Sequence, residues 1–299
     1  MSGSSADNVK ISPVNALWRI EAQELIDFTG LTGADVKGGY FNISTAKDAI
    51  LNYVWGDDSV EADPAPAGRT AIAMTVVGDS DTAATLATAC AAAIDGEAGY
   101  TAVVSDTTKV LVTRAAVGVV TETADVDMGV GITQCRYGKD LNMGLLNGNV
   151  ELSLAPANFI VTAHQSGVTP RAALYQGLET AEVGLELLET TDSNLKEVYG
   201  VYGTTGFTPG AGTEVYGVGT SKQGENLLPY AARLELKPVN AVDDTQNTTL
   251  MLALPVPDTL VFSGEDPKTL SVTFQGYVDD GKDNRISSVL FGDPTQDGL

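Results

Sequence analysis

The sequence predicts a mainly β protein: a β-sandwich or barrel core with one short helix, joined to a small α+β module. Several segments of the C-terminal half alternate apolar and polar residues, as half-buried strands do. One alanine-rich run in the N-terminal half has helical spacing, and many glycines and prolines mark turns. We expect an N-terminal arm with core strands at residues 1–38, the α+β module at 39–134 and the core at 135–299.

In the arm, apolar pieces at residues 18–20 and 25–28 are typical of strands. In the module, the run SDTAATLATACAAAID at residues 80–95 predicts a helix, with Asp79 as its N-cap and Gly96 at its end. The module's strands are expected at residues 40–44, 50–55, 70–77, 100–105 and 109–113.

The core is organised around the strand expected at residues 178–189. Ala181, Val183, Leu185 and Leu187 fall on one face, and Glu182 and Glu186 fall on the other. Residues 191–193 are good helix-start residues, and Gly200 stands where that short helix would end. Other core strands are expected at residues 150–154, 159–163, 171–175, 215–218, 231–237, 248–254, 259–262 and 269–276.

A glycine-rich stretch at residues 200–226 separates the short helix from the later strands. Loops of this length in a compact domain are uncommon and often functional. We therefore expect residues 200–226 to form a long mobile loop, which is either a contact segment that becomes ordered on assembly or a simple surface loop.

The charge balance is strongly acidic, with 17 basic and 39 acidic residues and a formal net charge of −22. This balance argues against attraction to nucleic acid, which needs cations to neutralise phosphates. No apolar run approaches the length of a membrane span, and the N-terminus lacks a signal-peptide pattern, so we expect folding in a cytoplasm. For Cys90 and Cys135 we favour two free thiols over a disulfide.

Residues for catalysis or metal binding are scarce. His164 is the one histidine, and nothing marks an acid and an oxyanion site to accompany it. Neither a nucleophile elbow nor a phosphate-binding loop is present, and one histidine with two distant cysteines does not make a zinc site. The acidic turn at residues 279–284 lacks the spacing of a calcium loop. We expect no enzyme activity, no metal and no cofactor.

Two stretches resemble phage structural proteins. The turn HQSGVTP at residues 164–170, the strand after it, and LLETTDSNL at residues 187–195 resemble the tail tube (major tail) proteins of long-tailed bacteriophages. The module resembles an α+β unit that recurs in phage structural proteins, through YFNI at 40–43, YVW at 53–55, DPAPAGRT at 63–70 and the helical run at 82–93.

The resemblance implies a structural virion protein of the phage tail. Its subunits would form six-membered rings that stack into a hollow conduit for the genome, assembled in the host cytoplasm, with the module outside. Other implied partners are sheath, tape-measure, baseplate and tail-terminator proteins, with DNA passing without binding and no membrane contact. It does not distinguish contractile from non-contractile tails.

Alternation and resemblance together give candidate residues. The lumen-facing acidic candidates are Glu182, Glu186, Glu151 and Glu235, and the inter-ring loop candidates are Gly200, Phe207, Tyr216 and Asn226. The alternative function is a monomeric β-sandwich binding module of the virion, a decoration protein or adhesin, which an exposed aromatic patch would favour.

Overall fold

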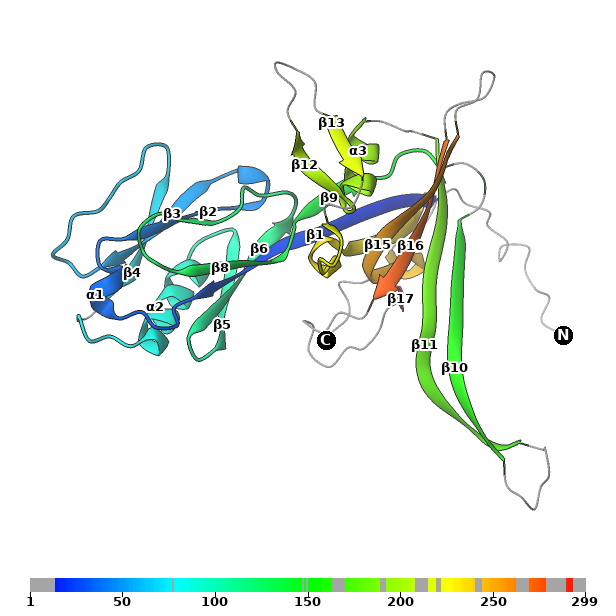
Figure 1. Cartoon of the computed structure of the whole chain (residues 1–299), viewed down its shortest axis with the longest axis horizontal. Coiled ribbons are helices and arrows are strands. Elements are labelled where there is room, and N and C mark those ends of the chain that lie inside the picture. Colours follow the sequence, from blue (N-terminus) through cyan, green and yellow to red (C-terminus); the bar gives the residue numbers. More distant parts are fainter. Residues whose placement is uncertain are drawn as a thin grey trace. The chain divides into compact units, whose positions relative to one another are not determined.

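The computed structural model describes residues 14–76, 78–146, 148, 150–162, 170–188, 192–207, 215–218, 222–239, 244–261, 269–277 and 289–292. Within these ranges the chain is mainly β with a small α+β part, which confirms the predicted fold class (Figure 1). The strands are mostly antiparallel; β3 and β4 form a parallel pair. His164 and the acidic turn at 279–284 lie outside the described residues.

The chain forms two compact units. Unit 1 takes residues 1–18, 141–227 and 232–299, and unit 2 takes residues 19–140 and 228–231. The strand β1 (Val14–Asp27) runs through the boundary without a break. The α+β module expected at 39–134 falls inside unit 2, together with most of β1.

Unit 2 contains a small sheet in the order β4-β3-β2-β7 and a second set of strands in the order β1-β6-β5, with β8 also paired to β1. Ile26, Phe41, Val54 and Leu86 are among the fully buried side chains of its core. Its elements are α1 (Gly33–Val36), β2 (Tyr40–Ser44), η2 (Ala46–Asp48), β3 (Leu51–Asp57), β4 (Thr70–Thr75), α2 (Ala83–Asp95), β5 (Tyr100–Asp106), β6 (Lys109–Val117), β7 (Ala124–Asp125), β8 (Gly131–Arg136) and η5 (Leu228–Tyr230). The strand β9 (Lys139–Asn142) follows and pairs with β1.

The helix α2 starts later than predicted. Its N-cap is Thr82, whose side-chain oxygen accepts a hydrogen bond from the Thr85 N–H at 3.3 Å. Asp79, predicted as the cap, instead accepts a hydrogen bond from Lys37 Nζ at 2.5 Å, so that prediction was wrong. The end at Gly96 is as expected. Leu86, Ala87 and Cys90, which the helical spacing places on one face, are buried, and Ile94 is buried as well.

A charged cluster is buried inside unit 2. Arg114 on β6 and Glu24 on β1 are both fully buried, with 2.8 Å between Arg114 Nη2 and Glu24 Oε2. Arg114 Nε donates to the Ser44 carbonyl at 2.7 Å, and the guanidinium lies over the Tyr100 ring. Glu24 also accepts a hydrogen bond from the Thr123 N–H at 3.1 Å. These bonds connect strands from both sheets.

Unit 1 is built on strands in the order β10-β11-β16-β15-β14, with β14 next to β1 and β17 paired to β15. Trp18 is central to its core: its indole N–H donates to the Ala253 carbonyl at 3.1 Å, and its ring meets Phe274 edge-on at 5.7 Å. The elements are β10 (Glu151–Thr162), β11 (Pro170–Leu187), α3 (Asp192–Gly200), β12 (Gly203–Phe207), β13 (Val215–Val218), β14 (Ala232–Pro238), η6 (Asp244–Gln246), β15 (Thr248–Val261), β16 (Thr269–Tyr277) and β17 (Val289–Phe291).

Several predicted pairs of short strands are single long strands. The pieces at 150–154 and 159–163 are joined in β10, those at 171–175 and 178–189 in β11, and those at 248–254 and 259–262 in β15. Pro156 and Gly177 lie between the short strands that were expected. They are accommodated because the β10–β11 register shifts beside each of them, and such bulges tolerate residues that a regular ladder does not.

The strand predicted at 215–218 is present as β13, whereas β12, at the start of the stretch expected as a long loop, was not predicted. The helix α3 ends at Gly200 as predicted, and β12 and β13 then pair as an antiparallel hairpin, with Gly203 opposite Val218. Phe207 and Tyr216 are therefore strand residues, while Asn226 lies in an exposed segment before η5. Residues 208–214 and 219–221 are outside the described residues.

The two cysteines are free thiols with different exposure, which gives a testable prediction. Cys90 is fully buried and Cys135 is partly buried, and burial raises the pKa of both thiols. With a thiol reagent at mildly alkaline pH, we expect Cys135 to react more slowly than free cysteine, with a rate that keeps rising above pH 9, and Cys90 to react only after denaturation. Cys135→Ser should leave a native protein that takes up no reagent; uptake by that variant would contradict the burial of Cys90.

Candidate functional site

The candidate site is one face of the unit 1 sheet, across β10, β11, β16 and β15. The strand register places its side chains in rows. Three rows run across the strands β10, β11 and β16. They are Glu151–Gly184–Thr273, Ser153–Glu182–Gln275 and, from β11 to β16 alone, Glu186–Ser271. Because neighbouring positions in a row share a face, the carboxylates of Glu151, Glu182 and Glu186 lie on one side of the sheet. We call this side the acidic face.

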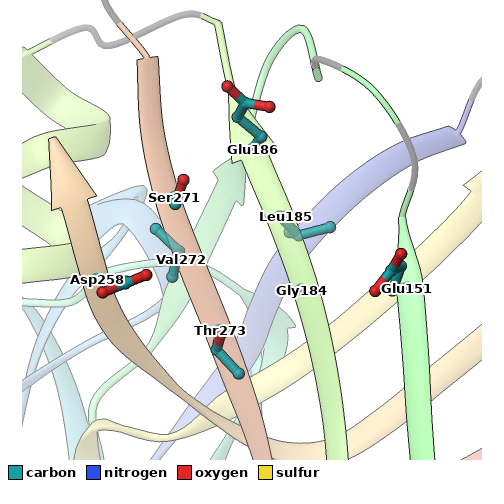
Figure 2. A pocket seen from close by; sticks show the side chains of 8 residues that line it. All are labelled: Glu151, Gly184, Leu185, Glu186, Asp258, Ser271, Val272 and Thr273. Atoms are coloured by element: carbon teal, nitrogen blue, oxygen red, sulfur yellow. The ribbon is translucent and has the colours of Figure 1, made fainter. Parts of the chain in front are cut away.

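Asp258 on β15 joins the same face. Figure 2 shows Glu151 on β10, Glu186 on β11 and Asp258 on β15. Ser271 and Thr273 lie on β16, between β11 and β15. These residues line a shallow hollow of about 170 Å³. Glu151 and Asp258 are exposed, and Glu182 and Glu186 are half-buried. The hollow is too shallow to enclose a ligand, so the feature is better described as a charged surface than as a binding pocket.

The opposite face of the same strands is apolar and buried. Val183 and Leu187 on β11 and Phe274 on β16 have no exposed surface. The predicted alternation is therefore present at residues 181–187, and it directs the carboxylates away from the core. This division follows directly from the period-two pattern, because a strand with one buried face must send every second side chain to the other side.

Basic residues are nearly missing from these strands. Among β10, β11, β15 and β16, the sequence has one lysine or arginine, Arg171 near the start of β11. The hydrogen-bond partner of Glu182 is neutral: Gln275 Nε2 donates to Glu182 Oε1 at 3.2 Å. Tyr277 in turn donates its hydroxyl to Gln275 Oε1 at 3.3 Å. Such neutral donors orient a carboxylate without cancelling its charge.

The remaining lumen candidate behaves differently. Glu235 on β14 is only 2% exposed, and Lys237 Nζ lies 3.6 Å from its Oε2. Its period-two pattern with Leu234 and Leu236 suggested an outward side chain. However, all three side chains are buried, so both faces of β14 are covered at this point. Glu235 does not belong to the acidic face.

Asp258 is the member that the sequence did not indicate. It lies in the segment PVPDTL, between the strands expected at 248–254 and 259–262. Pro255 and Pro257 instead lie within β15, and the register with β16 shifts just after Pro257. Only the long-range pairing of β15 with β16 places Asp258 near Glu151 and Glu186, and no local pattern predicts it.

Among the residues that the structure describes, no group of three or more histidine, cysteine or acidic side chains is arranged to hold a metal ion. In the same residues, no helix has the length and apolar composition needed to cross a bilayer. No model of a known protein family matches the chain, and a comparison with curated proteins finds no significant match. The acidic face presents carboxylates and hydroxyls to whatever lies above it.

Proposed function

We propose that this protein is the subunit of a phage tail tube, a hollow conduit through which a genome passes. The observation that carries the proposal is the acidic face of unit 1: carboxylates on three strands point to one side, and their strands contain almost no basic residues. The resemblance of residues 164–170 and 187–195 to tail tube proteins supports the same function.

The proposed mechanism is passive. When subunits form closed rings, with the acidic face lining the bore, the carboxylates of every copy act on the same enclosed space. Phosphates of the passing DNA are then repelled from all sides, so the DNA does not bind to the wall. Screening at physiological salt has a length of about 8 Å, which leaves charges close to the bore surface effective. The fully buried opposite face gives the wall its rigidity.

The alternative is a monomeric β-sandwich binding module, which would use exposed aromatic side chains to hold a ligand. Among the described residues, Tyr277 at one end of β16 is the one aromatic residue beside the carboxylates of the acidic face. Exposed aromatic residues Phe159 and Tyr175 lie farther along β10 and β11. This composition favours repulsion of a polyanion over recognition of a glycan. A monomeric module also gives no reason for the scarcity of basic residues in these four strands.

The test is the assembly state of the purified chain. We expect negative-stain electron microscopy at high concentration to reveal six-fold rings or hollow tubes, and light scattering to give a mass that increases with concentration. A mass that stays monomeric at every concentration, together with binding to a glycan array, would contradict the tube and favour the binding module.

A further inference from the structure

One face of the small sheet in unit 2 carries aromatic rings. Tyr40 of β2 pairs with Trp55 of β3. Two residues along, Asn42 pairs with Tyr53, so all four side chains lie on one side of the sheet. The rings of Tyr40 and Tyr53 meet edge-on, with 5.8 Å between their centroids. Val54, on the other side of β3, packs into the core with α2. We call Tyr40, Asn42, Tyr53 and Trp55 the aromatic face.

The connection from β3 to β4, residues 58–69, covers this face. We call it the strap. Because β3 and β4 are parallel, the strap must return across the sheet before β4 can begin. Its Asp63 carboxylate accepts a hydrogen bond from the Tyr53 hydroxyl, which places the strap on the side of the aromatic face. Burial alternates along it, with Pro64 and Pro66 half-buried between exposed residues.

Two polar atoms of the aromatic face are buried without being paired. Trp55 is only 7% exposed, and its indole Nε1 has no hydrogen-bond partner in the part of the chain that the structure describes. The same holds for Oδ1 of Asn42. A buried indole N–H normally finds an acceptor. Trp55 and Asn42 are diagonal neighbours on paired strands, which is within the reach of side chains of this length. The strap therefore covers a donor and an acceptor that it does not satisfy.

The chemistry of the two atoms indicates a ligand class. A hydroxyl group accepts a hydrogen bond from an N–H and donates one to an amide oxygen, so a single hydroxyl matches both Trp55 and Asn42. The neighbouring rings of Tyr40 and Tyr53 offer flat apolar surfaces. Ligand sites commonly combine such surfaces with a few polar groups. A saccharide fits this combination, because it carries hydroxyls around an apolar C–H face, whereas water would satisfy the polar atoms alone.

The surrounding charge selects a neutral saccharide. The strap contributes the carboxylates of Asp58, Glu61 and Asp63. Asp127 lies at the other end of the aromatic face, where it accepts a hydrogen bond from the Tyr40 N–H at 2.7 Å. The Lys37 ammonium is already matched, since its Nζ lies 3.3 Å from Oδ2 of Asp58. Anionic saccharides would be repelled by these carboxylates.

We propose that the aromatic face binds a neutral saccharide and that the strap is a lid that opens to admit it. The bond between Tyr53 and Asp63 is the latch. Two strap residues, Ser59 with φ 64° and Ala65 with φ 42°, have left-handed backbone conformations that favour glycine, so the closed strap is strained. The site belongs to unit 2, whereas the acidic face belongs to unit 1, so saccharide binding does not depend on the tube function.

Breaking the latch should strengthen binding. The closed strap competes with the ligand, so the apparent affinity is lowered in proportion to the fraction of open molecules. Asp63→Ala removes the acceptor of the Tyr53 hydroxyl, and we expect it to raise the affinity by about two- to tenfold, the range for loss of one hydrogen bond. Asp63→Asn is the matched control, because its amide oxygen still accepts that bond. It should bind like the native chain.

Tryptophan fluorescence of the full-length chain provides the measurement. The chain has two tryptophans, and Trp18 is fully buried with its N–H bonded to the Ala253 carbonyl. Changes in emission therefore report on Trp55. Acrylamide should quench Asp63→Ala more strongly than the native chain, and maltohexaose, cellohexaose or chitohexaose should reverse this difference. A heparin hexasaccharide, the anionic probe, should have no effect. Trp55→Phe keeps a ring but loses the donor, and calorimetry should give an affinity lower by about tenfold.

Each outcome decides a separate point. If Asp63→Ala keeps the native unfolding profile but binds none of these probes and no neutral glycan of an array, the site is overturned. Preference for the heparin fragment would overturn the neutral ligand, and equal affinity of Asp63→Ala and the native chain would overturn the lid. Tubes without saccharide binding leave the proposed function standing and remove this site. Saccharide binding by a chain that never assembles does the reverse.

Discussion

Replacing Arg114 with methionine is expected to destabilise unit 2 by about 3–5 kcal/mol, because it leaves the buried Glu24 carboxylate without its counter-charge. Methionine fills much of the same volume, so the loss would come from the charge and the hydrogen bonds, not from a cavity. Chemical denaturation should give a lower midpoint for unit 2. Hydrogen exchange followed by mass spectrometry should locate the loss, with β5 and β6 peptides exchanging faster and β11 and β16 peptides unchanged.

This loss of stability follows from the burial of the Glu24 carboxylate, which water cannot solvate. Its carboxylate is fully buried and is held by Arg114 and by the Thr123 N–H and hydroxyl. With Arg114 removed, only Thr123 would remain to compensate a full charge, and desolvation then dominates. The Ser44 carbonyl and the Tyr100 ring would also lose the guanidinium that they contact.

A double variant serves as the control. Arg114→Met combined with Glu24→Gln removes both charges, so its loss of stability should be smaller than that of Arg114→Met alone. The native cluster is itself imperfect, since Arg114 Nη1 has no hydrogen-bond partner in the part of the chain that the structure describes. A double variant that is less stable than Arg114→Met alone would show that the charge pair is not what holds these strands together.

The burial of Arg114 and Glu24 could not be predicted from the local sequence pattern. In KVLVTRAAV the alternation places Arg114 on the same face as Val110 and Val112, which are fully buried. A local pattern treats a charged residue in that place as a sign of exposure. Its partner Glu24 is distant in the chain, in a strand whose even-numbered residues are otherwise apolar. Only the pairing of β1 with β6 makes burial of both charges possible.

Elements with strong local signals were predicted well. The strand β2 has the predicted bounds, residues 40–44, and α3 ends at the predicted Gly200. The sharing of one face by Glu182 and Glu186 also followed from local alternation. Glu151 was also a predicted candidate, and the β10–β11 register places it on the same face. Asp258 was not predicted, because only the pairing of β15 with β16 brings it there. Local patterns determine which way a side chain points, whereas long-range pairing determines its neighbours.

Reversing the charge of the acidic face is expected to convert a protein that does not hold DNA into one that does. The variant combines Glu151→Lys, Glu182→Lys and Glu186→Lys. Lysines in these places would offer ammonium groups to phosphates from two adjacent strands of every copy. We expect assembled native protein to show no affinity for duplex oligonucleotides in an anisotropy titration and the variant to bind them. Its affinity should fall by on the order of a hundredfold or more between about 50 and 200 mM salt, as counterion release requires.

Net charge by itself must be separated from the position of the charge. Glu61→Lys, Glu97→Lys and Glu122→Lys together change the net charge by the same amount at exposed positions of unit 2. If the acidic face lines the passage, DNA retained inside tubes of the face variant should be protected from nuclease, whereas the unit 2 variant should leave any bound DNA accessible. Equal binding and equal digestion in both variants would mean that the acidic face has no special position in the assembly. Electron microscopy of both samples must confirm intact tubes, because protection has meaning only where a bore exists.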